Sequence, residues 1–188
     1  MGDLHHISKK TVVDDSLIER IARGDDVAFS ELYYATYKKL FAFVLSMVGN
    51  SADADDLVQE TYIKIRGAAH LYRPEGKAMS WIFKIAQNEA RMYWRKSKDI
   101  HFQELDAAEN FISFEGISNI EHREMLENAF KVLSQEEIQI VTLYLVSGFK
   151  HREIADLLKL PLATVLSKYR RGLKKMEKKL KEEYQDGK

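Results

Sequence analysis

The chain has 188 residues and a mass of 21.8 kDa, with 29 basic residues, 29 acidic residues, 45% hydrophobic residues and no cysteine. This length allows one domain or two small ones, and the composition is that of a globular protein. The lack of cysteine excludes disulfide scaffolds and thiolate metal sites. No apolar run is long enough to cross a membrane, and no secretory signal opens the chain, so we expect a cytoplasmic protein without membrane insertion.

The apolar pattern is helical through the first half of the chain. Residues 27–48 place apolar side chains at spacings of three and four, which predicts a helix that ends at Gly49-Asn50. A second helix follows with Ser51 as its N-cap and with acidic residues in its first turns. A third helix is predicted at 78–97, after a loop that contains one proline and one glycine.

The pattern breaks in the middle of the chain. Residues 98–120 are acidic and aperiodic, which predicts a linker. Helical periodicity resumes at 121–133. Ser134 and Glu137 then have the spacing of a capping box, which predicts the start of the next helix.

The last part of the chain has a helix-turn-helix pattern. A short helix at 150–158 is followed by the tight connection 159–161 and by a longer helix at about 162–182. Pro161 suits a first helical turn, where its missing amide hydrogen costs nothing, and the small Ala155 lets two helices approach closely. Such a motif places its second helix in the major groove of DNA.

These elements predict an all-α protein of two small helical domains joined by a linker, with the helix-turn-helix in the C-terminal domain. The predicted organisation is an N-terminal extension at 1–16, a first domain at 17–97, an acidic linker at 98–120 and a second domain at 121–188.

The longer helix of the motif has an apolar face and a basic face. Residues 148–181 carry eleven basic and three acidic groups, a candidate footprint for a polyanion. The positions expected to face inward are Val165, Tyr169, Leu173, Met176 and Leu180. The candidates for DNA contacts, base edges first and phosphates later, are Thr164, Ser167, Lys168, Arg170, Arg171, Lys174 and Lys175.

An acidic cluster lies on one face of the helix that follows residue 50. Asp53, Asp56 and Glu60 are at helical spacing. Acids here could simply stabilise the helix dipole, or could hold a metal, although no histidine is near. Leu57 and Gln59 add apolar and hydrogen-bonding groups beside the charge, which favours a docking surface for a basic partner.

The loop at 71–79 and the helix after it combine cations with aromatic rings. Rings interleaved with cations suit unpaired bases, which stack on the rings while the cations hold the backbone. Trp81 and Tyr93 fit the core better than the surface, whereas Trp94 fits either.

Three motifs, taken in order, resemble a known family. They are Asp53–Lys64, Ser80–Asn88, and Glu153–Ala155 with Thr164–Ser167. With the connecting helices they cover about residues 17–182, and the chain resembles a bacterial sigma factor of the extracytoplasmic-function group of the sigma-70 family. It differs from the usual pattern at Met92, Ala163 and Leu166, where related sequences have an acid, a glycine and a basic residue.

The resemblance implies a stress-response transcription factor that is not an enzyme, needs no cofactor or metal, and is held inactive by an anti-sigma factor. It would bind core RNA polymerase, on the clamp helices of the largest subunit, through Asp53, Asp55, Asp56, Leu57, Gln59, Glu60 and Ile63. It would read and melt the −10 element of promoter DNA through Tyr72, Arg73, Lys77, Asn88, Arg91, Trp94 and Arg95. The helix-turn-helix would read the −35 element.

Three other classes remain open at this point. A stand-alone helix-turn-helix repressor or activator would be a homodimer on a palindromic site. A structural helical adaptor would bind neither DNA nor polymerase. An enzyme finds little support, because the six histidines have no metal-ligand spacing and no nucleotide-binding or nucleophile motif is present.

Overall fold

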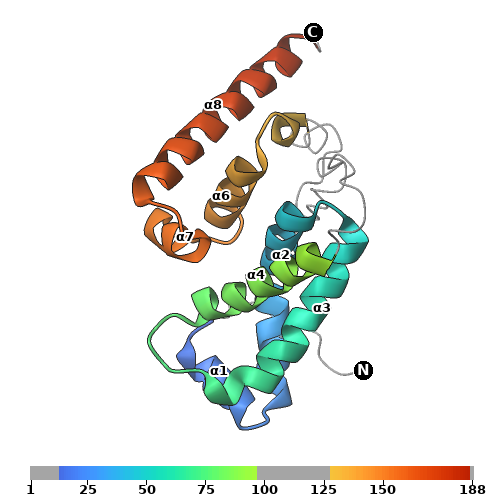
Figure 1. The fold of residues 1–188 in the computed structure, drawn as a ribbon, viewed down its shortest axis with the longest axis vertical. Helices are drawn as coiled ribbons and strands as arrows, with labels where there is room; N and C mark the ends of the chain where they lie inside the picture. The colour runs from blue at the N-terminus through green and yellow to red at the C-terminus, as the bar shows by residue number, and fades with distance from the viewer. Residues whose placement is uncertain (1–12, 97–127, 187–188) are drawn as a thin grey trace, which may run out of the picture.

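The computed structural model describes residues 13–96 and 128–186, and within them the regular secondary structure is helical. The predicted linker at 98–120 and most of the N-terminal extension lie outside the described residues. The N-terminal part comprises α1 (Asp15–Ala22), α2 (Asp26–Val48), α3 (Ser51–Ala68), the short 3-10 helix η1 (Ala69–Leu71) and α4 (Ala78–Lys96). The C-terminal part comprises α6 (Gln135–Leu145), α7 (His151–Leu158) and α8 (Leu162–Asp186) (Figure 1). The predicted all-α fold with a helix-turn-helix is confirmed.

The junction of α2 and α3 follows the sequence pattern with one correction. Gly49 ends α2 in the left-handed region at φ 77°, and its amide donates to the carbonyl of Leu45. The N-cap of α3 is Asn50 and not Ser51, because the Asn50 side chain accepts from the amides of Ala52 and Asp53. Ser51 is the first helical residue instead.

Helix α1 begins two residues before the predicted domain start at 17. Asp14 is its N-cap and accepts from the Leu17 amide, while Leu17, Ile18 and Ile21 are buried. The helix packs on α2 and η1, so the segment around Asp14 and Asp15 is part of the N-terminal domain.

The N-terminal domain is built around α2. This helix packs against α1, α3 and α4, and it buries Leu40, Phe43 and Val44 completely. Lys64 of α3 pairs with Glu89 of α4, whose carboxylate is largely buried, and thereby fixes the pair of helices that carries two of the predicted contact surfaces. Full burial of an apolar side chain contributes about 1.5–3 kcal/mol, so this core dominates the stability of the domain.

In the C-terminal domain, the helices α6, α7 and α8 meet at one corner. The predicted capping box at Ser134 and Glu137 is confirmed. The turn of the helix-turn-helix closes at Lys159, which lies in the left-handed region at φ 57°. One ring from each helix, Tyr144, His151 and Tyr169, meets the other two at centroid distances of 4.4–4.7 Å.

The inward face of α8 differs from the predicted one at residue 173. Val165 and Met176 are buried as expected, but Gly172 is buried rather than Leu173. A Cβ atom at Gly172 would lie 3.4 Å from a side-chain methyl of Val141, so the glycine lets α8 approach α6 closely. The helix is therefore turned so that the neighbouring lysines come to face α6.

The two domains contact each other. In Figure 1, α6 and α7 lie against α2 and α4, and both helix pairs are in contact. The Phe149 ring, after the α6–α7 turn, packs edge-on against the fully buried Phe83 of α4 at 4.8 Å. Gln135 donates to the backbone carbonyl of Met47 at 3.1 Å. The apolar cores of the two domains thus form one continuous cluster.

Candidate functional site

The acidic helix α3 has an exposed face that contains part of the predicted docking set. Asp56, Gln59, Glu60 and Ile63 are all exposed, at spacings of three and four that align them along the helix. Ile63 leaves 64% of its surface open, which is high for an isoleucine. An apolar side chain beside two carboxylates suits a partner that is basic and partly apolar.

Three other members of that set have partners inside the domain. The Tyr93 hydroxyl donates to Asp53 at 2.8 Å, and the Tyr37 hydroxyl donates to Asp55 at 2.7 Å. Burial raises the pKa of Tyr37, and the hydrogen bond to Asp55 adds to this effect, so the tyrosine stays neutral. Leu57 packs against the core. The exposed contact face of α3 is therefore narrower than the predicted set.

The loop before α4 presents two cations. Arg73 and Lys77 are exposed, whereas Tyr72 is half-buried and packs its ring against Trp81 at 5.1 Å. The Tyr72 hydroxyl donates to Asp15 at the start of α1. Burial, reinforced by this carboxylate, raises the pKa of Tyr72 to about 12.

Helix α4 separates its cations from its rings. Asn88, Arg91 and Arg95 are exposed at helical spacing and line one face. Trp94 is half-buried, and its indole nitrogen donates to the carbonyl of Met47 at 2.9 Å. Trp81 and Tyr93 are also half-buried and pack against the core. The exposed groups of α4 are thus suited to bind a nucleic-acid backbone. Its aromatic rings instead pack within the domain and stabilise the position of the helix.

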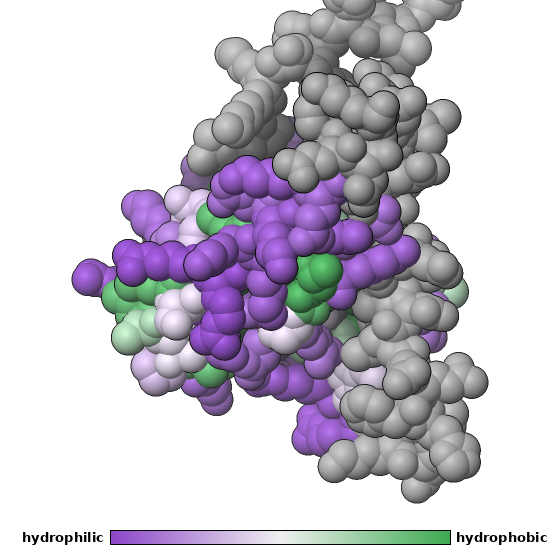
Figure 2. Space-filling model, turned by 90° about the horizontal axis from the view of Figure 1, so that it is seen from above, coloured by the Kyte–Doolittle hydropathy of each residue, from purple (hydrophilic) through white to green (hydrophobic). Residues whose placement is uncertain are grey.

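The predicted DNA contacts of α8 fall into two groups. Ser167, Arg170, Arg171 and Lys174 are exposed, and Thr164 is half-buried near the start of the helix. Lys168 pairs with Glu136, and Lys175 pairs with Glu137 at 2.7 Å, so both lysines face α6. Viewed from the end at which α8 projects, the described surface is predominantly hydrophilic (Figure 2).

Glu137 is the electrostatic centre of this domain. Its side chain is 2% exposed, and its carboxylate caps α6 by accepting from the Ser134 amide and also accepts from Lys175. Burial by itself would raise the pKa of Glu137, but the hydrogen bonds to Lys175 and Ser134 outweigh it and hold the pKa below its ordinary value. The Arg171 guanidinium, 57% exposed, lies 3.8 Å away.

Sequence reasoning missed several of these contacts. The role of Asp15 and the pairing of Glu136 with Lys168 depend on which elements meet in space, which periodicity along one helix does not give. A signal for α1 was present, since Asp14 precedes an apolar 17, 18, 21 pattern. The corresponding signal for the contact between domains was Phe149, a large apolar side chain in the connection between two predicted helices.

Neither a metal centre nor a membrane span is found among the residues that the structure describes. Within 13–96 and 128–186, no group of three or more metal-ligating side chains converges on a common point. The described helices include none that is both long and apolar enough to cross a bilayer.

Two family models match the chain. The model described as Sigma-70 region 2 matches residues 32–100, and the model described as Sigma-70, region 4 matches residues 123–176. The extracytoplasmic-function RNA polymerase sigma-E factor of Salmonella typhimurium is 29% identical over 182 residues, covering 90% of this chain and 95% of the relative.

Two solved structures share the fold. The structure of CnrH in complex with the cytosolic domain of CnrY matches with a TM-score of 0.65 and 21% identity, over 90% of this chain and 98% of that one. The sigma factor RpoE from Bartonella quintana, in complex with the anti-sigma factor NepR, matches with a TM-score of 0.65 and 23% identity, over 81% of this chain and 96% of that one.

Proposed function

This chain belongs to the extracytoplasmic-function group of the sigma-70 family, and we propose that it binds core RNA polymerase and directs promoter-specific initiation. It would recognise the −35 and −10 elements and help to melt the −10 DNA. The family is one of transcription initiation factors rather than of enzymes. The observation that carries the proposal is the separation of an exposed acidic face on α3 from an exposed cationic face on α8.

Core polymerase binding is assigned to α3. Asp56, Gln59, Glu60 and Ile63 supply the contacts, because they are the exposed members of the predicted set. Asp53 and Asp55 contribute their charge, since each accepts from a neutral tyrosine hydroxyl and neither pairs with a cation among the described residues. Charges beside an interface speed association more than they tighten the complex.

Recognition of the −35 element is assigned to α8. Thr164 and Ser167 lie in its first two turns, where a recognition helix reaches base edges. Arg170, Arg171 and Lys174 are exposed further along and are placed for phosphates. Lys168 and Lys175 act mainly within the domain, through Glu136 and Glu137.

Melting of the −10 element is assigned to the loop before α4 and to α4 itself. Removing a base from the stack costs a few kcal/mol, which contacts to the unpaired strand must offset. Arg73, Lys77, Asn88, Arg91 and Arg95 are exposed for that strand. Tyr72 and Trp94 are half-buried, so they act in this proposal by shaping the loop and anchoring α4.

An anti-sigma factor is the proposed regulatory partner. The support is that a structural relative, RpoE of Bartonella quintana, was solved with its anti-sigma factor. The anti-sigma factor would cover the exposed faces of α3, α4 and α8 through which the protein would bind polymerase and promoter DNA.

The test is run-off transcription with purified core polymerase and a library of promoter-length fragments. Heparin-resistant transcripts that appear only with this protein support the proposal, and their upstream sequences give both promoter elements. A matched pair of variants links the activity to α3. Glu60→Lys should weaken core binding several-fold, because it places a like charge opposite a basic partner, whereas Glu182→Lys, a charge-matched change near the far end of α8, should not. Absence of core binding by the wild-type chain would overturn the proposal and favour a stand-alone helix-turn-helix regulator.

A further inference from the structure

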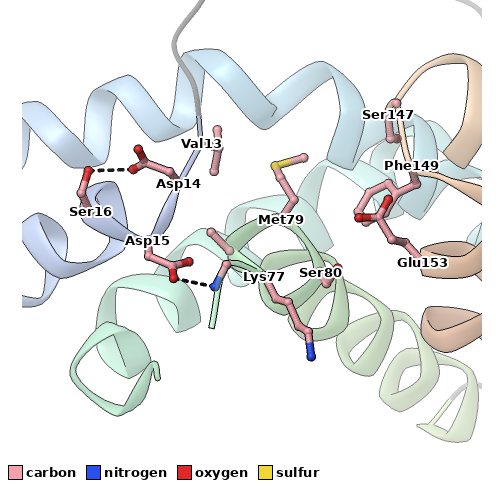
Figure 3. A pocket seen from close by; sticks show the side chains of 13 residues that line it. Val13, Asp14, Asp15, Ser16, Lys77, Met79, Ser80, Ser147, Phe149 and Glu153 are labelled. Atoms are coloured by element: carbon pink, nitrogen blue, oxygen red, sulfur yellow. Dashed lines mark hydrogen bonds between the residues drawn. The ribbon is translucent and has the colours of Figure 1, made fainter. Parts of the chain in front are cut away.

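One carboxylate at the start of α1 accepts hydrogen bonds from the loop before α4 at two points. An oxygen of Asp15 accepts from the Tyr72 hydroxyl, and the other accepts from the Gly76 amide at 2.6 Å. The contacts span 57 and 61 residues of sequence. Asp15 lines a cavity together with Ser147, Phe149 and Glu153 (Figure 3), and the volume of this cavity is about 460 Å³.

The two neighbouring acids of α1 divide two tasks. Asp14 is the N-cap, with Oδ1 accepting from the Leu17 amide and the Ser16 hydroxyl, so Asp15 is not needed for capping. The buried side chains of Leu17, Ile18 and Ile21 fix α1 to the domain. Asp15 therefore reaches the loop from a firmly anchored helix.

The loop itself offers little packing to fix its shape. Residues 73–77 are exposed one after another, and Gly76 lies in the left-handed region at φ 69°. The Tyr72 ring rests on Trp81 at one end, and the Lys77 carbonyl accepts from the Trp81 amide at the other. Asp15 adds long-range bonds at Tyr72 and at Gly76, and so holds the stretch that carries Arg73.

We propose that Asp15 is a positioning residue for promoter opening: by holding Tyr72 and Gly76 it fixes the 72–77 loop in the shape that receives an unpaired base of the −10 element. This proposal rests on the proposed function of the loop. The matched region 2 begins at residue 32, so α1 and Asp15 lie outside the part of the chain to which the family match refers.

The experiment compares Asp15→Ala, Asp15→Asn and the matched control Asp14→Ala in holoenzyme built with the full chain. It uses a promoter obtained from the run-off selection and measures binding to single-stranded −10 oligonucleotides of native and altered sequence. Asp15→Ala should lose roughly tenfold or more of its affinity for the native oligonucleotide, as expected for a lost charged hydrogen bond, and should discriminate less against altered ones. Asp15→Asn should recover part of the loss, because an amide can still accept from Gly76. Asp14→Ala lowers the melting temperature but should keep the −10 preference.

A second readout is independent of transcription. Amide hydrogen exchange of the free protein should speed up at Gly76 in Asp15→Ala, with the exchange of α2 and α3 unchanged. The proposal is overturned if Asp15→Ala matches Asp14→Ala in oligonucleotide preference, or if exchange at Gly76 does not respond. If instead the wild-type chain fails to bind core polymerase while Gly76 exchange does respond, the proposed function fails and the Asp15 contact itself stands.

Discussion

The acidic helix α3 and the basic helix α8 lose members of their predicted contact sets to the interior in different ways. On α3, two carboxylates accept from tyrosine hydroxyls, which are neutral, so Asp53 and Asp55 keep their negative charge. On α8, two lysines pair with glutamates, so the charges of Lys168 and Lys175 are balanced by Glu136 and Glu137. The acidic surface of α3 thus keeps its full negative charge. The net positive charge on the surface of α8 is smaller than its count of lysines and arginines suggests.

The largest expected effect is on stability, from removal of the buried partner on the α8 side. Glu137→Ala should lower the free energy of unfolding by about 2 kcal/mol, since it removes a cap and a charged hydrogen bond while half-exposed Lys175 regains water. Asp55→Ala should cost about 1 kcal/mol, because a partly exposed tyrosine hydroxyl can find water. Thermal and urea unfolding of the full chain measure both.

Glu136→Ala serves as the control for that difference. The Glu136 side chain is 56% exposed, so its pair with Lys168 should contribute less than about 1 kcal/mol. Equal losses for Glu136→Ala and Glu137→Ala would contradict the assignment of Glu137 as the electrostatic centre of the domain.

The next effect concerns DNA binding by the two groups of cations on α8. Arg170→Ala/Lys174→Ala should weaken holoenzyme binding to duplex −35 DNA roughly tenfold and lower the salt slope by about 2, one unit for each lost phosphate contact. Lys168→Ala/Lys175→Ala should leave the slope close to that of the wild type, since those ammonium groups already have partners. A titration of binding against salt concentration gives both slopes, and a larger change in the second variant would reverse the grouping.

A smaller effect is expected for core polymerase binding by α3. Two double variants distinguish residues that contact the polymerase from residues that contribute only their charge. Asp56→Asn/Glu60→Gln should speed dissociation from core polymerase a few-fold, as expected for exposed charge pairs. Asp53→Asn/Asp55→Asn keeps oxygen acceptors for the two tyrosines and should mainly slow association at low salt. Association and dissociation rates measured at two ionic strengths distinguish a lost contact from a lost charge. Identical rates for both variants would mean that the tyrosine hydrogen bonds of Asp53 and Asp55 do not change how these residues act in core binding.

The sequence predicts the helices far better than it predicts which charges are available. Helix ends at Gly49 and Ser134 follow from local chemistry, and local patterns carry that information. The availability of Lys175 depends on a glutamate 38 residues away, and that of Asp53 on a tyrosine 40 residues away. Such pairs are set by helix packing, and the rotation of α8 that brings Gly172 inward decides which lysines face α6.

The smallest expected effect is a change in how stability depends on pH. It measures the contribution of ionised Glu137, the carboxylate that pairs with Lys175 of α8. The pKa of Glu137 is lower in the folded protein than its ordinary value of 4.5. The unfolded chain therefore binds the proton more readily, so the ionised group stabilises the fold fully above pH 4.5, and this contribution disappears as the pH falls through the folded pKa. The difference in unfolding free energy between the wild type and Glu137→Gln should be constant from neutral pH down to about pH 4.5 and should shrink below it.

Glu177→Gln is the control, because the pKa of Glu177 is also lowered by its pair with Lys181, but that pair is exposed and screened by water. Urea unfolding over this pH range should show the shrinking difference only for Glu137→Gln, and a parallel change in Glu177→Gln would mean that general surface charge, and not the buried carboxylate, controls the acid response.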